Sequence, residues 1–204
     1  MVSWGTDSFS GMTDYIKSNF PSHEKFLIGH SVGALILGLN PDSSQFKKLA
    51  FVGSQNAYIG HLDWPVNIFG LLGFGLMQPV TTALLGYFPA SKFNLGRDLP
   101  SGVGFDWRSL VIKRKSTGLL LEKAGFDYAK NLSQKVLVVR AEDDSWLTEK
   151  GVSTLLREVY PNLKPVRSVK LVSESPKGNI GHVNYFRSYN SVLWKEILDF
   201  FENE

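Results

Sequence analysis

The sequence predicts an α/β protein with a mostly parallel β-sheet that is covered by helices on both faces. Short apolar runs rich in β-branched residues alternate with segments of helical spacing, which is typical of such sheets. A glycine-rich turn also joins the first of these runs to an apolar helix. With 204 residues, 43% of them hydrophobic, the chain can bury a sizeable core within one domain.

Each element of this fold is predicted by a local pattern. Strands are expected where short apolar runs have the length and composition of buried strands, at residues 25–28, 48–53, 135–140 and 168–172. Helices are expected where apolar residues recur at helical spacing, at residues 11–20, 34–39, 149–160 and 192–201. Pro21 ends the first of these helices, and Asn40 with Pro41 ends the second.

Residues 55–130 interrupt this alternation. They are rich in aromatic residues, glycine and proline and contain no clear strand, so we expect an inserted cap of helices and loops. Residues 1–54 and 131–204 would then form the core of the protein. The cap contains apolar side chains that either form a lid, which would suit an apolar substrate, or pack as the cap's own core: Phe69, Leu72, Phe74, Leu76, Met77, Leu84, Leu85, Tyr87 and Phe88.

One stretch of this insertion, residues 64–91, has no charged residue. A membrane span needs about 20 apolar residues, but Asn67, Gln78 and Pro79 interrupt the apolar run. We therefore expect a buried or lid-like segment, with membrane association as the alternative.

Composition excludes several classes of site. Because the chain has no cysteine, it has no disulfide framework, zinc-thiolate site, iron–sulfur cluster or cysteine nucleophile. A net charge of +3 does not indicate a nucleic-acid partner. The first residues lack the basic and apolar regions of a signal peptide. Together with the absence of cysteine, this favours a cytoplasmic location.

The glycine-rich turn carries a candidate nucleophile. Residues 29–33 read Gly-His-Ser-Val-Gly and match G-x-S-x-G between a predicted strand and a predicted helix. That setting is expected of a nucleophile elbow, in which Ser31 sits on a strained turn and small flanking residues let neighbouring backbone approach closely. The alternative is an ordinary glycine-rich turn between a strand and a helix.

A serine nucleophile needs a base and an acid that orients the base. Asp144 follows the predicted strand at 135–140, where a carboxylate would lie at the carboxyl edge of the sheet. Asp143 is the close alternative, and the acidic cluster could also be a solvated loop. His182 follows the last predicted strand and is the candidate base. The other histidines are expected at the surface, beside the nucleophile or at a pocket edge: His23, His30 and His61.

On these motifs the chain resembles the alpha/beta-hydrolase superfamily, in which nucleophile, acid and base follow one another in this order. More narrowly it looks like a group of uncharacterised predicted bacterial hydrolases, through residues 86–89, 95–103, 143–148 and 181–182 with Trp107 and Phe186. The resemblance implies that Ser31, His182 and Asp144 cleave an ester, thioester or amide of a small acyl substrate. The Val32 N–H would be an oxyanion-hole donor, and neither a metal nor an organic cofactor is implied.

The beginning of the chain departs from the superfamily pattern. Only about 25 residues precede the elbow strand, and the loop that supplies a second oxyanion donor has no counterpart. We interpret the hydrolase core as N-terminally incomplete, in preference to a deliberate fragment or a short variant. Since losing one such donor costs about a hundredfold or more in rate, the alternative function is a catalytically impaired protein of this fold that binds a lipid or a protein partner.

Overall fold

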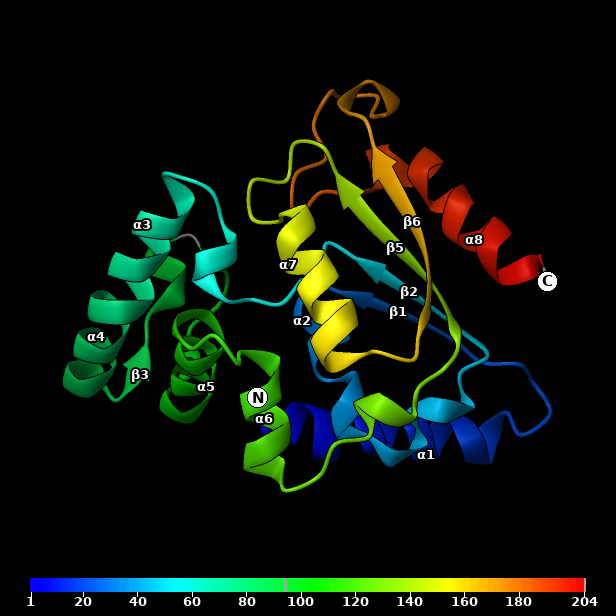
Figure 1. The fold of residues 1–204 in the computed structure, drawn as a ribbon, viewed down its shortest axis with the longest axis horizontal. Coiled ribbons are helices and arrows are strands. Elements are labelled where there is room, and N and C mark those ends of the chain that lie inside the picture. The colour runs from blue at the N-terminus through cyan, green and yellow to red at the C-terminus, as the bar shows by residue number, and fades with distance from the viewer. Residues whose placement is uncertain (94, 204) are drawn as a thin grey trace.

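The computed structural model describes residues 1–93 and 95–203. Four strands form a parallel sheet in the order β1-β2-β5-β6 (Figure 1). These strands are β1 (Phe26–His30), β2 (Lys48–Val52), β5 (Lys135–Ala141) and β6 (Lys164–Lys170). The predicted α/β architecture is therefore confirmed.

The last strand lies earlier in the chain than predicted. The sequence indicated residues 168–172, whereas β6 begins at Lys164 and ends at Lys170. β6 pairs only with β5 in this sheet, and most of its side chains are exposed. An exposed edge strand has no need of an apolar run, so its start leaves little hydrophobic signal.

Side chains of β2 alternate between two cores, one on each face of the sheet. Leu49 and Phe51 are fully buried in a core that also contains residues of α2 (Val32–Leu35) and α7 (Glu149–Thr154). Ala50 and Val52 are buried on the other face, together with Ile197 of α8 (Lys195–Glu202). This period-two alternation explains why β2 is buried along its whole length.

The remaining core helices differ from the predictions at their ends. α1 (Ser10–Asn19) closely matches the predicted helix, and a π-helical turn, Leu155–Val159, continues α7 over most of the predicted length. The helix predicted at 34–39 was wrong in extent, because α2 ends at Leu35 and a 3-10 turn follows at Leu37–Leu39. Gly38 disfavours a helix, and Ala129 approaches so closely that a Cβ on Gly38 would lie 2.6 Å from the Ala129 Cβ. A 3-10 turn, Ser188–Trp194, likewise replaces the start of the last predicted helix ahead of α8.

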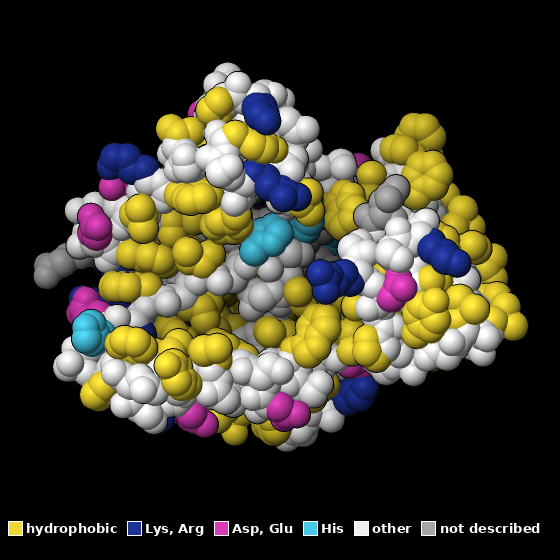
Figure 2. Space-filling view, turned by 180° about the vertical axis from the view of Figure 1, so that it is seen from behind, with side chains coloured by type: hydrophobic (Ala, Val, Ile, Leu, Met, Phe, Trp, Pro, Cys, Tyr) yellow, Lys and Arg dark blue, Asp and Glu magenta, His cyan; other side chains and the backbone are white. Residues whose placement is uncertain are grey.

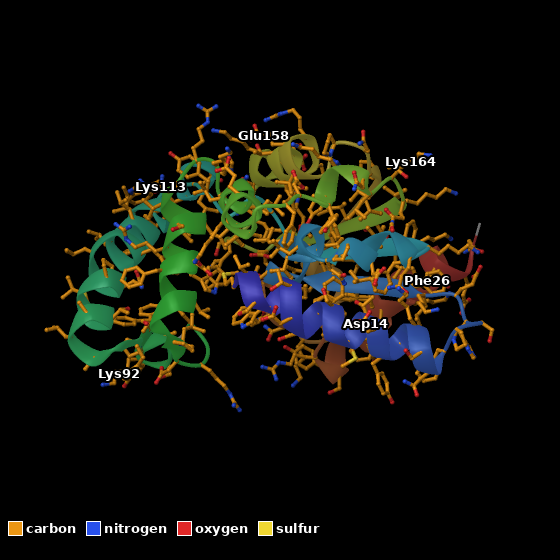
Figure 3. The ribbon with its side chains drawn as sticks, turned by 90° about the horizontal axis from the view of Figure 1, so that it is seen from below. Asp14, Phe26, Lys92, Lys113, Glu158 and Lys164 are labelled. Carbon is orange, nitrogen blue, oxygen red and sulfur yellow. The ribbon has the colours of Figure 1, made fainter. Side chains whose placement is uncertain are left out.

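Residues 59–124 form a helical group that lies beside the sheet (Figures 1 and 3). Its helices are α3 (Val66–Leu72), α4 (Gln78–Leu85), α5 (Ser101–Ile112) and α6 (Thr117–Ala124). The expectation of no strand was wrong, since β3 (Tyr87–Phe88) pairs antiparallel with β4 (Leu99–Pro100). Strands of two residues are too short for a periodic pattern. The division into a core and a cap stays a prediction.

A π-helical turn, Gly73–Met77, joins α3 to α4, so that Val66–Leu85 is one continuous helix. It is long and apolar enough to cross a membrane by length and composition. Only a small part of it is buried, so the expectation of a buried segment was wrong. Of the side chains named for a cap core, Phe74 packs against Phe88 and Trp107, whereas the leucines, Phe69 and Met77 are exposed. Phe88 lies just beyond the helix and is buried, as expected if it belongs to a core of the cap.

Replacing a leucine in the sheet core should destabilise the protein much more than replacing a leucine on this helix. Leu49 is fully buried, and Leu49→Ala removes packing and leaves a cavity, so we expect a loss of about 3 kcal/mol in the free energy of unfolding. Leu84 is 79% exposed, so Leu84→Ala should change the free energy of unfolding by less than about 0.5 kcal/mol. Urea denaturation of both variants would measure this, and equal losses would contradict the described core.

Candidate active site

Ser31 follows β1 in an unusual backbone conformation, with φ 51° and ψ −117°. A non-glycine residue at positive φ is strained, so neighbouring structure must hold it in place. The Ser31 N–H donates to the Val52 carbonyl at 2.9 Å, and the Ser54 hydroxyl donates to the Ser31 carbonyl at 2.9 Å. Both partners come from the end of β2, so the neighbouring strand helps to impose the turn.

The two glycines of the motif differ in what they allow. A Cβ on Gly29 would lie 2.8 Å from the Ala34 backbone nitrogen, so only glycine lets the strand and the following helix approach this closely. A Cβ on Gly33 would meet nothing within 4 Å. The predicted need for small residues is therefore confirmed at the first glycine and wrong at the second.

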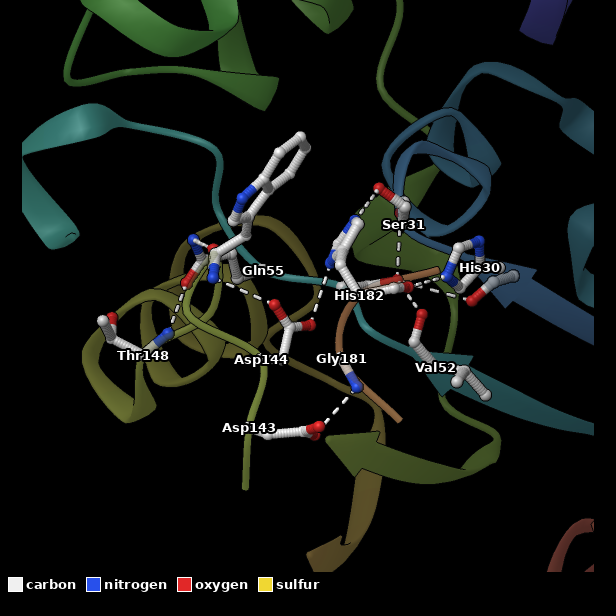
Figure 4. Close-up of polar contacts among 12 residues, drawn as sticks. His30, Ser31, Val52, Gln55, Asp143, Asp144, Thr148, Gly181 and His182 are labelled. Atoms are coloured by element: carbon white, nitrogen blue, oxygen red, sulfur yellow. Dashed lines mark hydrogen bonds and ion pairs between the residues drawn. The ribbon is translucent and has the colours of Figure 1, made fainter. Parts of the chain in front are cut away.

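The structure brings Ser31, His182 and Asp144 together in one chain of contacts (Figure 4). The Ser31 Oγ lies 2.9 Å from the His182 Nε2, and the His182 Nδ1 lies 2.8 Å from the Asp144 Oδ2. Ser31 follows β1, Asp144 follows β5, and His182 lies on the loop beyond β6. They converge because the carboxyl ends of parallel strands lie at one edge of the sheet.

Asp143 and Asp144 make different contacts although they are adjacent in sequence. The Asp144 side chain is 1% exposed, and its second oxygen accepts the Trp146 N–H at 2.9 Å. Asp143 instead accepts the backbone N–H groups of Ile180 and Gly181, at 3.0 and 2.8 Å. Asp144 thus contacts the imidazole, whereas Asp143 holds the loop that carries it.

His30 also contacts this loop, because its Nε2 lies 2.8 Å from the His182 carbonyl oxygen. Burial lowers the pKa of His30, which favours a neutral ring whose Nε2–H donates to that carbonyl. The ring also makes an edge contact with Phe186, at 5.8 Å between centroids. The expected packing of His30 beside the nucleophile is thus observed, and its hydrogen bond to the backbone of His182 had no signal in the sequence.

Two further contributors to the site were missed by the sequence analysis. Trp146 stacks over the His182 ring with a centroid distance of 5.1 Å. The Gln55 side chain donates to the Trp146 carbonyl at 2.7 Å and accepts the Thr148 N–H at 2.9 Å. Trp146 lies two residues after the candidate acid, within the stretch 143–148 that carries the narrower resemblance, but the sequence assigned it no role. Gln55 comes from a segment far away in the chain and gives none.

The remaining histidines lie outside these contacts. His23 is exposed, as predicted, and its ring contacts Phe20. His61 is buried rather than at the surface, and it lines a cavity with Arg114 and Lys150, which fits the pocket-edge expectation. Across residues 1–93 and 95–203 no three His, Asp or Glu side chains form a group that could hold a metal ion.

Several solved structures resemble this chain at low sequence identity, two esterases among them. An esterase from Pyrococcus furiosus aligns with a TM-score of 0.52 and 13% identity, over 95% of this chain and 60% of the esterase. An esterase domain from Rhodothermus marinus aligns with a TM-score of 0.50 and 13% identity, over 97% of this chain and 67% of that domain.

This chain therefore spans about three fifths of the length of the Pyrococcus esterase. No protein-family model and no curated protein matches the sequence. The parallel sheet, the order of its strands and these two likenesses together establish that the chain has the alpha/beta-hydrolase fold.

Proposed function

We propose that this protein is a serine hydrolase that cleaves a carboxylic ester, thioester or amide through an acyl-enzyme. The observation that carries the proposal is the chain of contacts from Ser31 through His182 to Asp144, with distances of 2.9 and 2.8 Å. A hydroxyl within hydrogen-bond reach of an imidazole, itself bound to a buried carboxylate, is the arrangement that activates a serine nucleophile.

In the first half-reaction, Ser31 attacks the acyl carbonyl while its proton passes to the His182 Nε2. The new C–O bond forms a tetrahedral intermediate whose oxygen carries negative charge. The Val32 N–H is at the first position of α2, where backbone amides lack partners within the helix, and would donate to this oxygen. Collapse breaks the bond to the leaving group, which takes the proton from His182. Water repeats these steps to release the acid.

Asp144 would act by orienting His182. Its oxygen accepts the Nδ1–H, which keeps the Nε2 free to accept the serine proton and stabilises the imidazolium that forms. Because Asp144 is almost fully buried, this interaction takes place in a poorly solvated environment, where it is stronger than in water.

The substrate would be a small acyl compound. An ester is favoured because the Pyrococcus and Rhodothermus structures described above are both named as esterases. Residues 55–130 would form a cap beside the nucleophile. Val32, next to Ser31, packs against a buried cluster of Met1, Leu110 of α5 and Leu120 of α6, which supports this role for the segment.

A fluorophosphonate probe should label Ser31 covalently, because the probe reacts with serines that are activated by a neighbouring base. We expect Ser31→Ala to abolish labelling and His182→Ala to slow it by about a thousandfold or more. Ser8→Ala, at an exposed serine, is the matched control and should label normally. Mass spectrometry of the labelled peptide gives the readout. A wild-type protein that binds ligand but takes no label would support the catalytically impaired alternative.

Replacing each aspartate by asparagine should distinguish their roles. Asp144→Asn would bind the wrong tautomer of His182, so we expect kcat for a p-nitrophenyl ester to fall by about 10⁴-fold. Asp143→Asn keeps one oxygen acceptor and leaves the second loop N–H without one, so we expect a loss of about tenfold. Circular dichroism would verify folding of both variants. A larger loss in Asp143→Asn than in Asp144→Asn would overturn the assignment of the acid.

The lowered pKa of His30 predicts a pH dependence of stability. The unfolded chain binds a proton at His30 more readily than the folded chain, so this histidine destabilises the fold as the pH falls below the ordinary imidazole range. Between about pH 7 and about pH 5, the melting temperature should therefore fall further in the wild type than in His30→Gln. Calorimetry at both values measures the difference. Equal decreases would show that His30 is not held neutral by the fold.

A further inference from the structure

The helix from Val66 to Leu85 presents an apolar face to solvent. Its most exposed positions recur every three or four residues and so lie along one side of the helix. We call this the α3–α4 face and define it by Phe69, Leu72, Leu76, Val80 and Leu84, which are between 48% and 79% exposed. The rim of the molecule that contains this helix, on the right of Figure 2, is largely covered by hydrophobic side chains.

The opposite side of the same helix carries two buried polar side chains beside Phe74, which packs against Phe88 and Trp107. Gln78 and Thr82 are 0% and 2% exposed, and the Gln78 amide donates to the Thr82 hydroxyl at 3.1 Å. α5 packs closely there, since a Cβ on Gly104 would lie 3.0 Å from the Gln78 amide nitrogen. A helix that only covers a protein core keeps its large apolar side chains inward, whereas this helix exposes most of its leucines.

The segment around this face is basic. Residues 64–115 contain six Lys and Arg against two Asp, a net charge of +4, so the rest of the chain carries −1 of the overall +3. One of the two acids, Asp106, is buried and paired with Lys123 at 2.6 Å. Lys92 and Lys113 are exposed and lie on this helical group, well apart from each other (Figure 3). The helical group that carries the apolar face thus also carries exposed basic side chains at two separate places.

Aromatic side chains with a polar atom flank the helix at both ends. Trp64 precedes it and is 80% exposed, and Tyr87 follows it and is 38% exposed. Tryptophan and tyrosine favour the boundary between lipid headgroups and acyl chains, because their rings are apolar and their N–H or O–H groups need hydrogen-bond partners.

We propose that the α3–α4 face docks on the surface of a membrane that contains anionic lipids. The apolar side chains enter the headgroup boundary, and the basic side chains of the helical group contact the anionic headgroups. The helix lies along the surface and does not span the bilayer, because its polar side is packed against α5. A second copy of the chain is a poorer occupant, since it would bring two segments of charge +4 together.

Co-sedimentation with lipid vesicles tests this proposal. We expect the protein to bind vesicles of phosphatidylcholine with phosphatidylglycerol more tightly than vesicles of phosphatidylcholine alone. The double variant Leu76→Glu with Leu84→Glu should lose at least about tenfold in binding, because charged groups replace two of the three most exposed apolar side chains of the face. Lys92→Gln with Lys113→Gln should reduce only the preference for the anionic vesicles, by roughly fivefold for each lysine.

The matched control carries the same change of charge on another surface. Val192 of the 3-10 turn before α8 and Leu198 of α8 are 60% and 56% exposed. α8 lies on the other side of the molecule from α3 and α4 in Figure 1. Val192→Glu with Leu198→Glu should bind vesicles like the wild type. Equal losses in both double variants, or no vesicle binding by the wild type, would overturn the proposal. So would a wild-type dimer that only the Leu76→Glu, Leu84→Glu variant dissociates.

Tryptophan fluorescence shows which surface meets the lipid. The chain has five tryptophans, and Trp64 next to the helix should enter the headgroup boundary. Anionic vesicles should therefore shift the emission to shorter wavelength, and Trp64→Phe should remove most of that shift. An unchanged shift in Trp64→Phe would place the contact elsewhere and contradict the proposal. Neither measurement requires catalysis by Ser31.

Discussion

The parallel register of three neighbouring strands is the constraint on which the rest of the site depends. His30 at the end of β1 is level with Val52 of β2, which is level with Val139 of β5. The backbone hydrogen bonds continue past the strand ends, from the Ser31 N–H to Val52 and from the Gly53 N–H to Val139. A shift of β2 by one residue would exchange its side chains between the two cores and displace the backbone that holds Ser31, so core packing and site geometry are set together.

His182 lies on a loop, and its position relies on contacts made by the backbone around it. Asp143 accepts two N–H groups from the residues just before His182, and His30 contacts the His182 carbonyl. Trp146 covers the ring, and Gln55 ties the Trp146 segment to the end of β2. A reactive side chain on a loop needs such support, because its geometry must be held within a fraction of an ångström to act.

The α3–α4 face contrasts with this tightly bonded region. The sheet buries apolar side chains on both faces, whereas the helix from Val66 to Leu85 buries Gln78 and Thr82 and exposes leucine and phenylalanine. Exposed apolar area of this extent on one helix is unfavourable in water and indicates a surface that is used for contact. The molecule therefore combines a site held by many hydrogen bonds with a separate exposed apolar face on one helix.

The sequence by itself determined the fold class and the residues of the candidate site, because both leave local patterns. Buried strands such as residues 135–140 need continuous apolar runs, and the turn at Ser31 needs Gly29. Only the tertiary structure decided which aspartate contacts His182, since Asp143 and Asp144 are equivalent in any local pattern and differ only in where the loop beyond β6 passes. The tertiary structure also decided the contacts of Gln55 and His30, because their hydrogen-bond partners are far away in the sequence. It decided the exposure of Leu84 as well, because the burial of a helix face depends on which elements pack against it.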